Sequence, residues 1–172
     1  MPKIALLVSL KIPDVTALTA RNALQRRMGY AGTLKDLRRE DFYSLEIEGD
    51  EASALALVTK LAEETNYFVN PNKHAFTVCP WGDWPAEKGN GLQTVRLLVT
   101  DPADTWGAGT AAALRERTGG QVQSAERGIM WTLSLASDSP AAARQLAEEI
   151  AVTRRIDQGL LVNPHFQEWQ LL

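Results

Sequence analysis

Val69-Asn70-Pro71 in the middle of the chain and Val162-Asn163-Pro164 near its end are each followed by a short run that alternates like a β-strand. The predicted elements between these marks also recur, at an offset of about 90 residues. Such internal repetition indicates two copies of one small fold. We therefore expect one repeat at residues 1–78 and a second at residues 92–172, joined by a linker at residues 79–91 that is rich in proline and glycine.

Hydrophobic periodicity gives both halves the same order of predicted elements. In the first half we expect a strand at 3–11, a helix after Pro13-Asp14 that ends at Gly29, a segment at 33–39 hairpinned through Arg39-Glu40-Asp41 to a strand at 43–47, a helix capped by Asp50, and a strand at 74–78. In the second half we expect a strand at 95–99, helices at 108–117 and after Ser139-Pro140, and a strand at 131–135.

The sum of these elements is an α+β fold with the order β-α-β-β-α-β in each copy. Two helices would cover one face of each small sheet. The first strand carries apolar residues on both faces, with Ile4 and Leu6 on one side and Ala5 and Leu7 on the other. A second apolar face needs a cover, since leaving it in water costs about 25 cal/mol per Å². We expect the second copy to provide that cover, which would make the chain an internal pseudo-dimer.

Composition is ordinary for a globular protein, with 172 residues, 45% hydrophobic residues and a net charge of −3. The negative charge disfavours non-specific binding to nucleic acid. The single cysteine, Cys79, rules out a disulfide within the chain and fits a reducing compartment. No apolar run approaches the roughly 20 residues that cross a bilayer. We therefore expect a cytoplasmic protein that binds neither membranes nor nucleic acid.

The residues that usually carry chemistry are sparse. His74 and His165 lie near the last strand of each half, where they are either paired ligands or acid–base groups, or surface residues of an edge strand. No cluster of Cys and His has the short spacing of a zinc site. Gly107-Ala108-Gly109 lacks the third glycine of a dinucleotide fingerprint and the lysine of a P-loop. We expect no catalytic residue, no metal and no cofactor.

The linker carries Trp81 and Trp84, which is unusual for a solvated tether. Burial of large aromatic rings is favourable because it removes apolar surface from water, so we expect these rings to pack against one of the sheets. A direct contact with a partner protein is the alternative.

Several short motifs in both halves resemble the PurS family, the small non-catalytic subunit of phosphoribosylformylglycinamidine synthase. The matching pieces are Leu10-Lys11, Pro13-Asp14, Met28-Gly29-Tyr30, Val69-Asn70-Pro71, Thr100-Asp101-Pro102, Trp106-Gly107, Leu160-Leu161-Val162-Asn163-Pro164 and Gln167-Glu168-Trp169. The resemblance spans nearly all of both halves outside the linker, although members of the family are usually single domains and this chain is a tandem. It implies ferredoxin-like, PurS-like domains.

The resemblance also implies an assembly role in purine biosynthesis. By this resemblance, a PurS-like dimer would bind both the ATP-dependent synthetase subunit and the glutaminase subunit and hold them together. The chain would also be able to form further homo-oligomers. Asn70, Pro71, Asn163 and Pro164 would then set turns near the partner surface. Two alternatives stay open: a regulatory module that binds a small ligand between two ferredoxin-like domains, and a small cofactor-free enzyme that uses His74 or His165.

Overall fold

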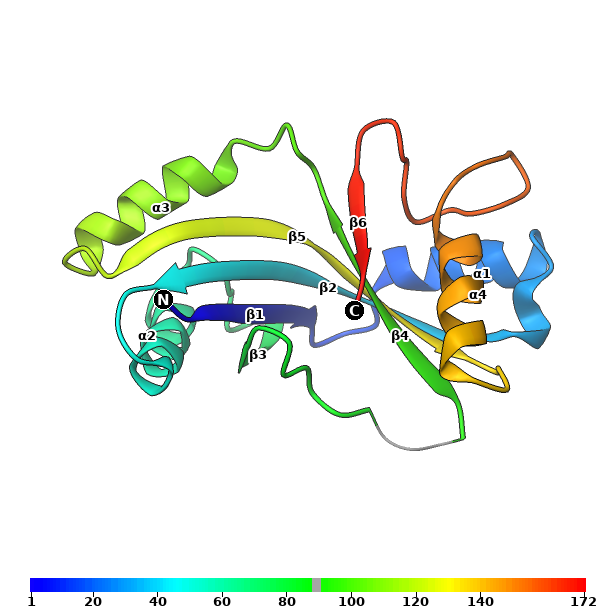
Figure 1. Cartoon of the computed structure of the whole chain (residues 1–172), viewed down its shortest axis with the longest axis horizontal. Coiled ribbons are helices and arrows are strands. Elements are labelled where there is room, and N and C mark those ends of the chain that lie inside the picture. Colours follow the sequence, from blue (N-terminus) through cyan, green and yellow to red (C-terminus); the bar gives the residue numbers. More distant parts are fainter. Residues whose placement is uncertain (88–90) are drawn as a thin grey trace. The chain divides into compact units, whose positions relative to one another are not determined.

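The computed structural model describes residues 1–87 and 91–172 of the chain. Its strands are β1 (Lys3–Leu10), β2 (Leu34–Ile47), β3 (His74–Pro80), β4 (Gln93–Thr100), β5 (Val122–Leu135) and β6 (Glu168–Leu171). Its helices are α1 (Val15–Arg26), α2 (Glu51–Glu64), α3 (Trp106–Arg117) and α4 (Pro140–Ala151), with a short 3-10 turn, η1, at Tyr30–Gly32. The described residues form an α+β fold with one antiparallel sheet in the order β3-β1-β2-β5-β4-β6 (Figure 1).

Both predicted N-caps are confirmed. The Asp50 side chain accepts a hydrogen bond from the backbone N–H of Ser53 at 2.9 Å and so begins α2. The Ser139 hydroxyl accepts one from the N–H of Ala142 at 3.2 Å, with Pro140 at the first position of α4. Each cap satisfies a backbone donor that the first helical turn leaves without an intrahelical partner.

The predicted hairpin through Arg39-Glu40-Asp41 is wrong, because β2 runs unbroken from Leu34 to Ile47. Its register with β1 continues without interruption from Lys3 opposite Glu46 to Val8 opposite Asp41. The three charged residues suggested a turn, but none of them is a glycine, proline or asparagine that supplies turn geometry. Each half therefore has the observed order β-α-β-α-β rather than β-α-β-β-α-β.

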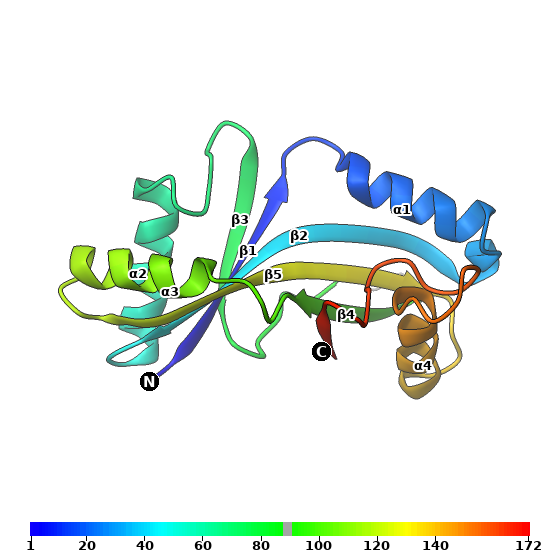
Figure 2. The same ribbon diagram turned by 90° about the horizontal axis from the view of Figure 1, so that it is seen from above.

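The described chain divides into two compact units that interleave the two halves of the sequence. The first unit consists of Met1–Ile12, Glu40–Ala86 and Ala103–Gly128, and the second of Pro13–Arg39, Glu87–Pro102 and Ile129–Leu172. The boundaries fall inside β2 and β5, so each of these strands contributes to both units (Figures 1 and 2). The units thus differ from the predicted segments 1–78 and 92–172. Residues 88–90 of the predicted linker lie outside the described part, and β3 already includes Cys79 and Pro80.

The core of the first unit lies on one face of its sheet. Ile4, Leu6 and Val8 alternate along β1 and so share that face. Against them pack Val58 of α2 and Leu114 of α3, both with no exposed surface. The two helices that cover this face therefore come from different halves of the sequence.

The second unit has a core of the same kind. Val95, Leu97 and Val99 share one face of β4. Leu24 of α1 and Ile150 of α4 are fully buried in the same cluster. Again one covering helix belongs to each half of the sequence, so α1 and α3 each complete a core whose other helix and first strand lie in the other half.

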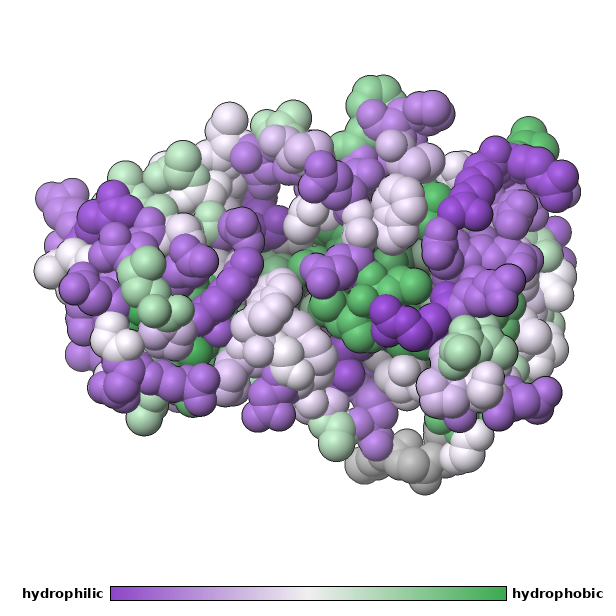
Figure 3. All heavy atoms as spheres, viewed as in Figure 1, coloured by the Kyte–Doolittle hydropathy of each residue, from purple (hydrophilic) through white to green (hydrophobic). Residues whose placement is uncertain are grey.

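Hydrophilic residues make up most of the face seen in Figure 3, with smaller hydrophobic areas between them. Within the described residues, no helix has the length and apolarity needed to cross a membrane.

Candidate functional site

The first Asn-Pro segment forms a tight turn held by the asparagine. The Asn70 side-chain oxygen accepts a hydrogen bond from the N–H of Asn72 at 3.0 Å. Its backbone carbonyl accepts from the N–H groups of Lys73 at 3.0 Å and His74 at 2.8 Å. The N–H of Asn70 donates to Nδ1 of His74 at 3.1 Å. Pro71 occupies the next position, where its fixed φ supports the turn.

The second Asn-Pro segment repeats this pattern bond for bond. The Asn163 side-chain oxygen accepts from the N–H of His165 at 3.1 Å. Its carbonyl accepts from Phe166 at 3.1 Å and Gln167 at 2.9 Å. The N–H of Asn163 donates to the Gln167 side-chain oxygen at 2.9 Å. The two turns therefore share one geometry, with Pro164 in the place of Pro71.

The shared geometry shows which residues are equivalent. Gln167 takes the place of His74, since each accepts a hydrogen bond from the asparagine N–H four positions earlier. His165 instead takes the place of Asn72, because the N–H of each donates to the asparagine side chain. The two histidines are thus not counterparts, and His74 uses Nδ1 to hold its turn. A pair of histidines acting as equivalent groups has no support in this arrangement.

The two turns differ in what they expose. Phe166 of the second turn is 72% exposed, and Ile156, in the preceding loop, is completely exposed. The equivalent of Phe166 in the first turn is Lys73, which is also exposed. An exposed apolar side chain such as Phe166 is suited to protein binding, since its burial by a partner removes apolar surface from water.

Trp81 and Trp84 lie against Phe42 of β2, with ring centroids 5.8 and 6.4 Å from it. Phe42 is opposite Leu7 in the β1–β2 register, on the face of the sheet away from α2 and α3. The two indoles contact each other edge to face at 5.4 Å. These rings therefore cover part of the helix-free face of the first unit.

A small polar network borders the indoles. The Lys3 ammonium lies 4.4 Å from the centre of the Trp81 ring and 3.0 Å from the Glu126 carboxylate. Ser44 donates a second hydrogen bond to Glu126 at 3.1 Å. The hydrogen bond from Lys3 lowers the pKa of Glu126 below its ordinary value, and this effect outweighs the partial desolvation that acts in the opposite direction. The network ties β1, β2 and β5 together within the first unit.

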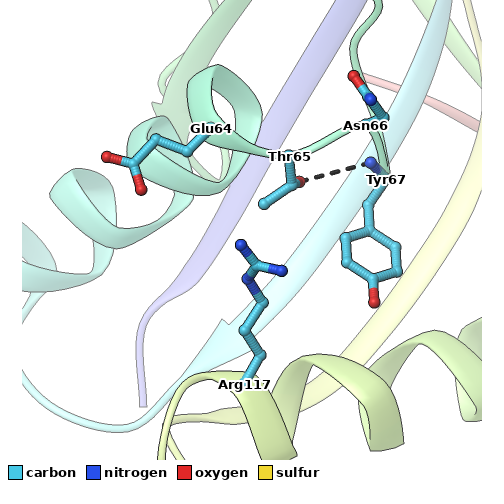
Figure 4. Close-up of a pocket in the computed structure, with 5 residues that line it drawn as sticks. All are labelled: Glu64, Thr65, Asn66, Tyr67 and Arg117. Carbon is cyan, nitrogen blue, oxygen red and sulfur yellow. Dashed lines mark hydrogen bonds between the residues drawn. The ribbon is translucent and has the colours of Figure 1, made fainter.

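A shallow depression of about 420 Å³ lies between the end of α2 and the end of α3. Figure 4 shows Glu64, Thr65, Asn66 and Tyr67 on one side and Arg117 reaching toward them from α3. The Thr65 hydroxyl is already engaged, as it donates to the carbonyl of Leu61 at 2.6 Å. Arg117 and Tyr67 offer a guanidinium and an aromatic ring to a bound molecule. No sequence pattern indicates this site, because its two sides are far apart in the chain.

The glycine pair at the start of α3 has a structural explanation in part. A Cβ on Gly107 would lie 2.1 Å from the backbone oxygen of Ala125, so α3 approaches β5 too closely for any side chain there. A Cβ on Gly109 would meet no atom within 4 Å.

Cys79 is buried. Within the described residues, no group of three Cys, His, Asp or Glu side chains is placed to hold a metal ion.

No family model matches the chain. Searches of curated proteins and of solved structures also found no match.

Proposed function

We propose that this chain is a non-catalytic scaffold subunit of the PurS type, which holds the synthetase and glutaminase subunits of phosphoribosylformylglycinamidine synthase together. The observation that carries the proposal is the repeated Asn-Pro turn. Asn70 and Asn163 make the same set of hydrogen bonds in two different units. A scaffold that joins two partners needs two binding surfaces, and a turn of the same backbone geometry in each unit would supply them.

The helices and strands that make up each unit support a tandem origin of the chain. In the first unit, the strands β3-β1-β2-β5 are accompanied by α2 and α3. If α3 and β5 stand in for the missing first helix and second strand, this is the β-α-β-β-α-β arrangement of a ferredoxin-like domain. The second unit follows the same scheme with α1 and β2. Two copies that exchange a helix and part of a strand in this way would form an internal pseudo-dimer, the covalent counterpart of a domain-swapped homodimer.

In this proposal the chain has no active site of its own and acts by holding its two partner subunits in a fixed arrangement. The synthetase consumes ATP and the glutaminase releases ammonia from glutamine, so the two active sites must stay in register for ammonia to pass between them. The exposed Phe166 beside the second turn is the strongest candidate for a partner contact. The first turn presents Lys73 at the equivalent position, so the two surfaces would select different partners.

The test of this proposal is partner binding by size-exclusion chromatography with the synthetase and glutaminase of the same organism. The wild-type chain should co-elute with both, and Phe166→Ser should weaken binding at least about tenfold, since an exposed aromatic anchor is worth about 2 kcal/mol or more. Val15→Ser is the matched control, because Val15 is 72% exposed, as Phe166 is, and lies at the start of α1. Co-elution that is absent with the wild-type chain would contradict the proposal.

A second candidate function is a regulatory module that binds a small ligand. The depression lined by Tyr67 and Arg117 favours it, because a guanidinium beside an aromatic ring binds carboxylates or phosphates of small molecules. Thermal unfolding in the presence of such anions tests this alternative. A rise in the melting temperature that Arg117→Gln abolishes would support it, and no rise with any anion tested would exclude it.

A further inference from the structure

Strand β3 is the last strand at one end of the sheet in the described chain, so one of its edges has no neighbouring strand. Its register with β1 fixes which backbone groups point toward that edge. The N–H of Trp81 donates to the carbonyl of Lys3 at 2.9 Å, and the N–H of Lys11 donates to the carbonyl of Lys73 at 2.9 Å. Antiparallel pairs alternate between bonded and non-bonded, so the odd-numbered residues of β3 bond to β1.

The even-numbered residues of β3 therefore direct their backbone groups outward. Phe76 and Val78 present both an N–H and a C=O to the open edge. At one end of this stretch the N–H of His74 is already bonded to the carbonyl of Asn70 at 2.8 Å. At the other end Pro80 has no N–H to offer. The open edge is thus short, with complete bonding capacity only at Phe76 and Val78.

The sequence of β3 contains no Lys, Arg, Asp or Glu between His74 and Pro80. Natural edge strands usually carry a charge or an internal proline that blocks pairing with another chain. Thr77, at the middle of the strand, is exposed and uncharged. The edge therefore carries no charged side chain that would oppose an added strand.

We propose that β3 pairs with β3 of a second copy of this chain, antiparallel and with the two-fold axis at Thr77. In this register Phe76 of each copy is opposite Val78 of the other, and these are the residues whose N–H and C=O groups face outward. They would exchange both of their backbone hydrogen bonds. Thr77 would face Thr77 at a non-bonded pair, which fits the direction of its own backbone groups toward β1.

Side chains and charges agree with the same register. Phe76 and Val78 are partly buried against the core of the first unit, so their pairing would continue that apolar face across the new junction. Beyond the strand ends, Lys73 of one copy would lie beside Trp81 of the other, close to Asp83. Lys73 and Asp83 are exposed and opposite in charge. The contact is self-complementary, as a two-fold interface requires.

The first experiment measures the mass of the full chain by light scattering over a range of concentrations. The wild-type chain should form a dimer, and Thr77→Lys should raise its dissociation constant at least about tenfold, because the two new ammonium groups would face each other across the axis. Thr77 is exposed, so the substitution spares the core. Gln170→Lys is the matched control on the other edge strand, β6, where Gln170 is also exposed, and it should leave the dimer unchanged. A wild-type chain that stays monomeric, or a dimer that only Gln170→Lys weakens, would overturn the proposal.

A second experiment fixes the register. Residues at a non-bonded antiparallel pair have Cα atoms about 4.5 Å apart, a separation that a disulfide can span. In a Cys79→Ala background, Thr77→Cys should therefore form a covalent dimer under mild oxidation, whereas Gln170→Cys should not. Cross-linking of both variants to the same extent, or of neither, would overturn the Thr77 axis. This inference does not rest on the scaffold proposal, since it needs only the purified chain.

Discussion

Replacing Leu114 by alanine should destabilise the first unit, although Leu114 lies in the second half of the sequence. Leu114 has no exposed surface and packs with Ile4, Val58 and Val122 in the core of that unit. Removing a fully buried leucine side chain costs about 2–5 kcal/mol, from lost burial and the cavity left behind. Helix propensity adds little, because alanine and leucine are both strong helix formers.

Native-state hydrogen exchange is the assay, because it reports opening separately for each strand. In Leu114→Ala, amides of β1 and β3 should lose more protection than amides of β4 and β6. The matched variant is Leu24→Ala, since Leu24 is equally buried and belongs to the core of the second unit. It should give the reverse pattern, although it lies in the first half of the sequence. If each variant instead weakened the strands of its own sequence half, the exchange of α1 and α3 between the cores would be refuted.

Two further predictions concern the first unit. Gly107→Ala should lower the free energy of unfolding by about 1–3 kcal/mol, because its Cβ would lie 2.1 Å from the backbone oxygen of Ala125. Gly109→Ala, which meets no atom within 4 Å, should be neutral or stabilising by up to about 1 kcal/mol, and urea denaturation that ranked the two variants equally would contradict this reading. The pKa of Glu126 is lowered chiefly by its hydrogen bond from Lys3. This bond therefore stabilises the folded state at any pH above the ordinary carboxyl pKa, and the stabilisation is lost as the pH falls through the lowered pKa of Glu126. Lys3→Met should therefore be less stable than wild type at about pH 7, and the difference should shrink as the pH falls below the ordinary carboxyl pKa. A pH-independent difference in urea denaturation would count against the linkage.

Local patterns in the sequence were sufficient for most single elements. The apolar alternation in residues 3–11 and the caps at Asp50 and Ser139 are short-range features, and β1, α2 and α4 form where they predict. The charged run Arg39-Glu40-Asp41 misled, because a turn and a strand with paired charges look alike in sequence. Arg39, for example, lies 3.6 Å from the Asp14 carboxylate.

The arrangement of the elements was beyond the reach of these patterns. The stripe that buries Leu24 is the same whether α1 covers the sheet of its own half or that of the other half. The hydrophobic periodicity of the sequence therefore does not predict that the two units interleave. The depression at Arg117 has the same origin, since it brings a helix end from one half beside Tyr67 from the other. The equivalence of His74 with Gln167 rather than His165 also needed the hydrogen bonds, because a histidine and a glutamine share only the role of acceptor.

The scaffold proposal is tested most directly by reconstituting the synthase activity from purified subunits. Glutamine-dependent formation of the amidine would be measured with the synthetase and glutaminase subunits alone and after addition of this chain. The account predicts that turnover with glutamine requires the chain, while turnover with added ammonia does not, because only transfer between the partners depends on a scaffold. Equal glutamine-dependent rates with and without the chain would contradict it.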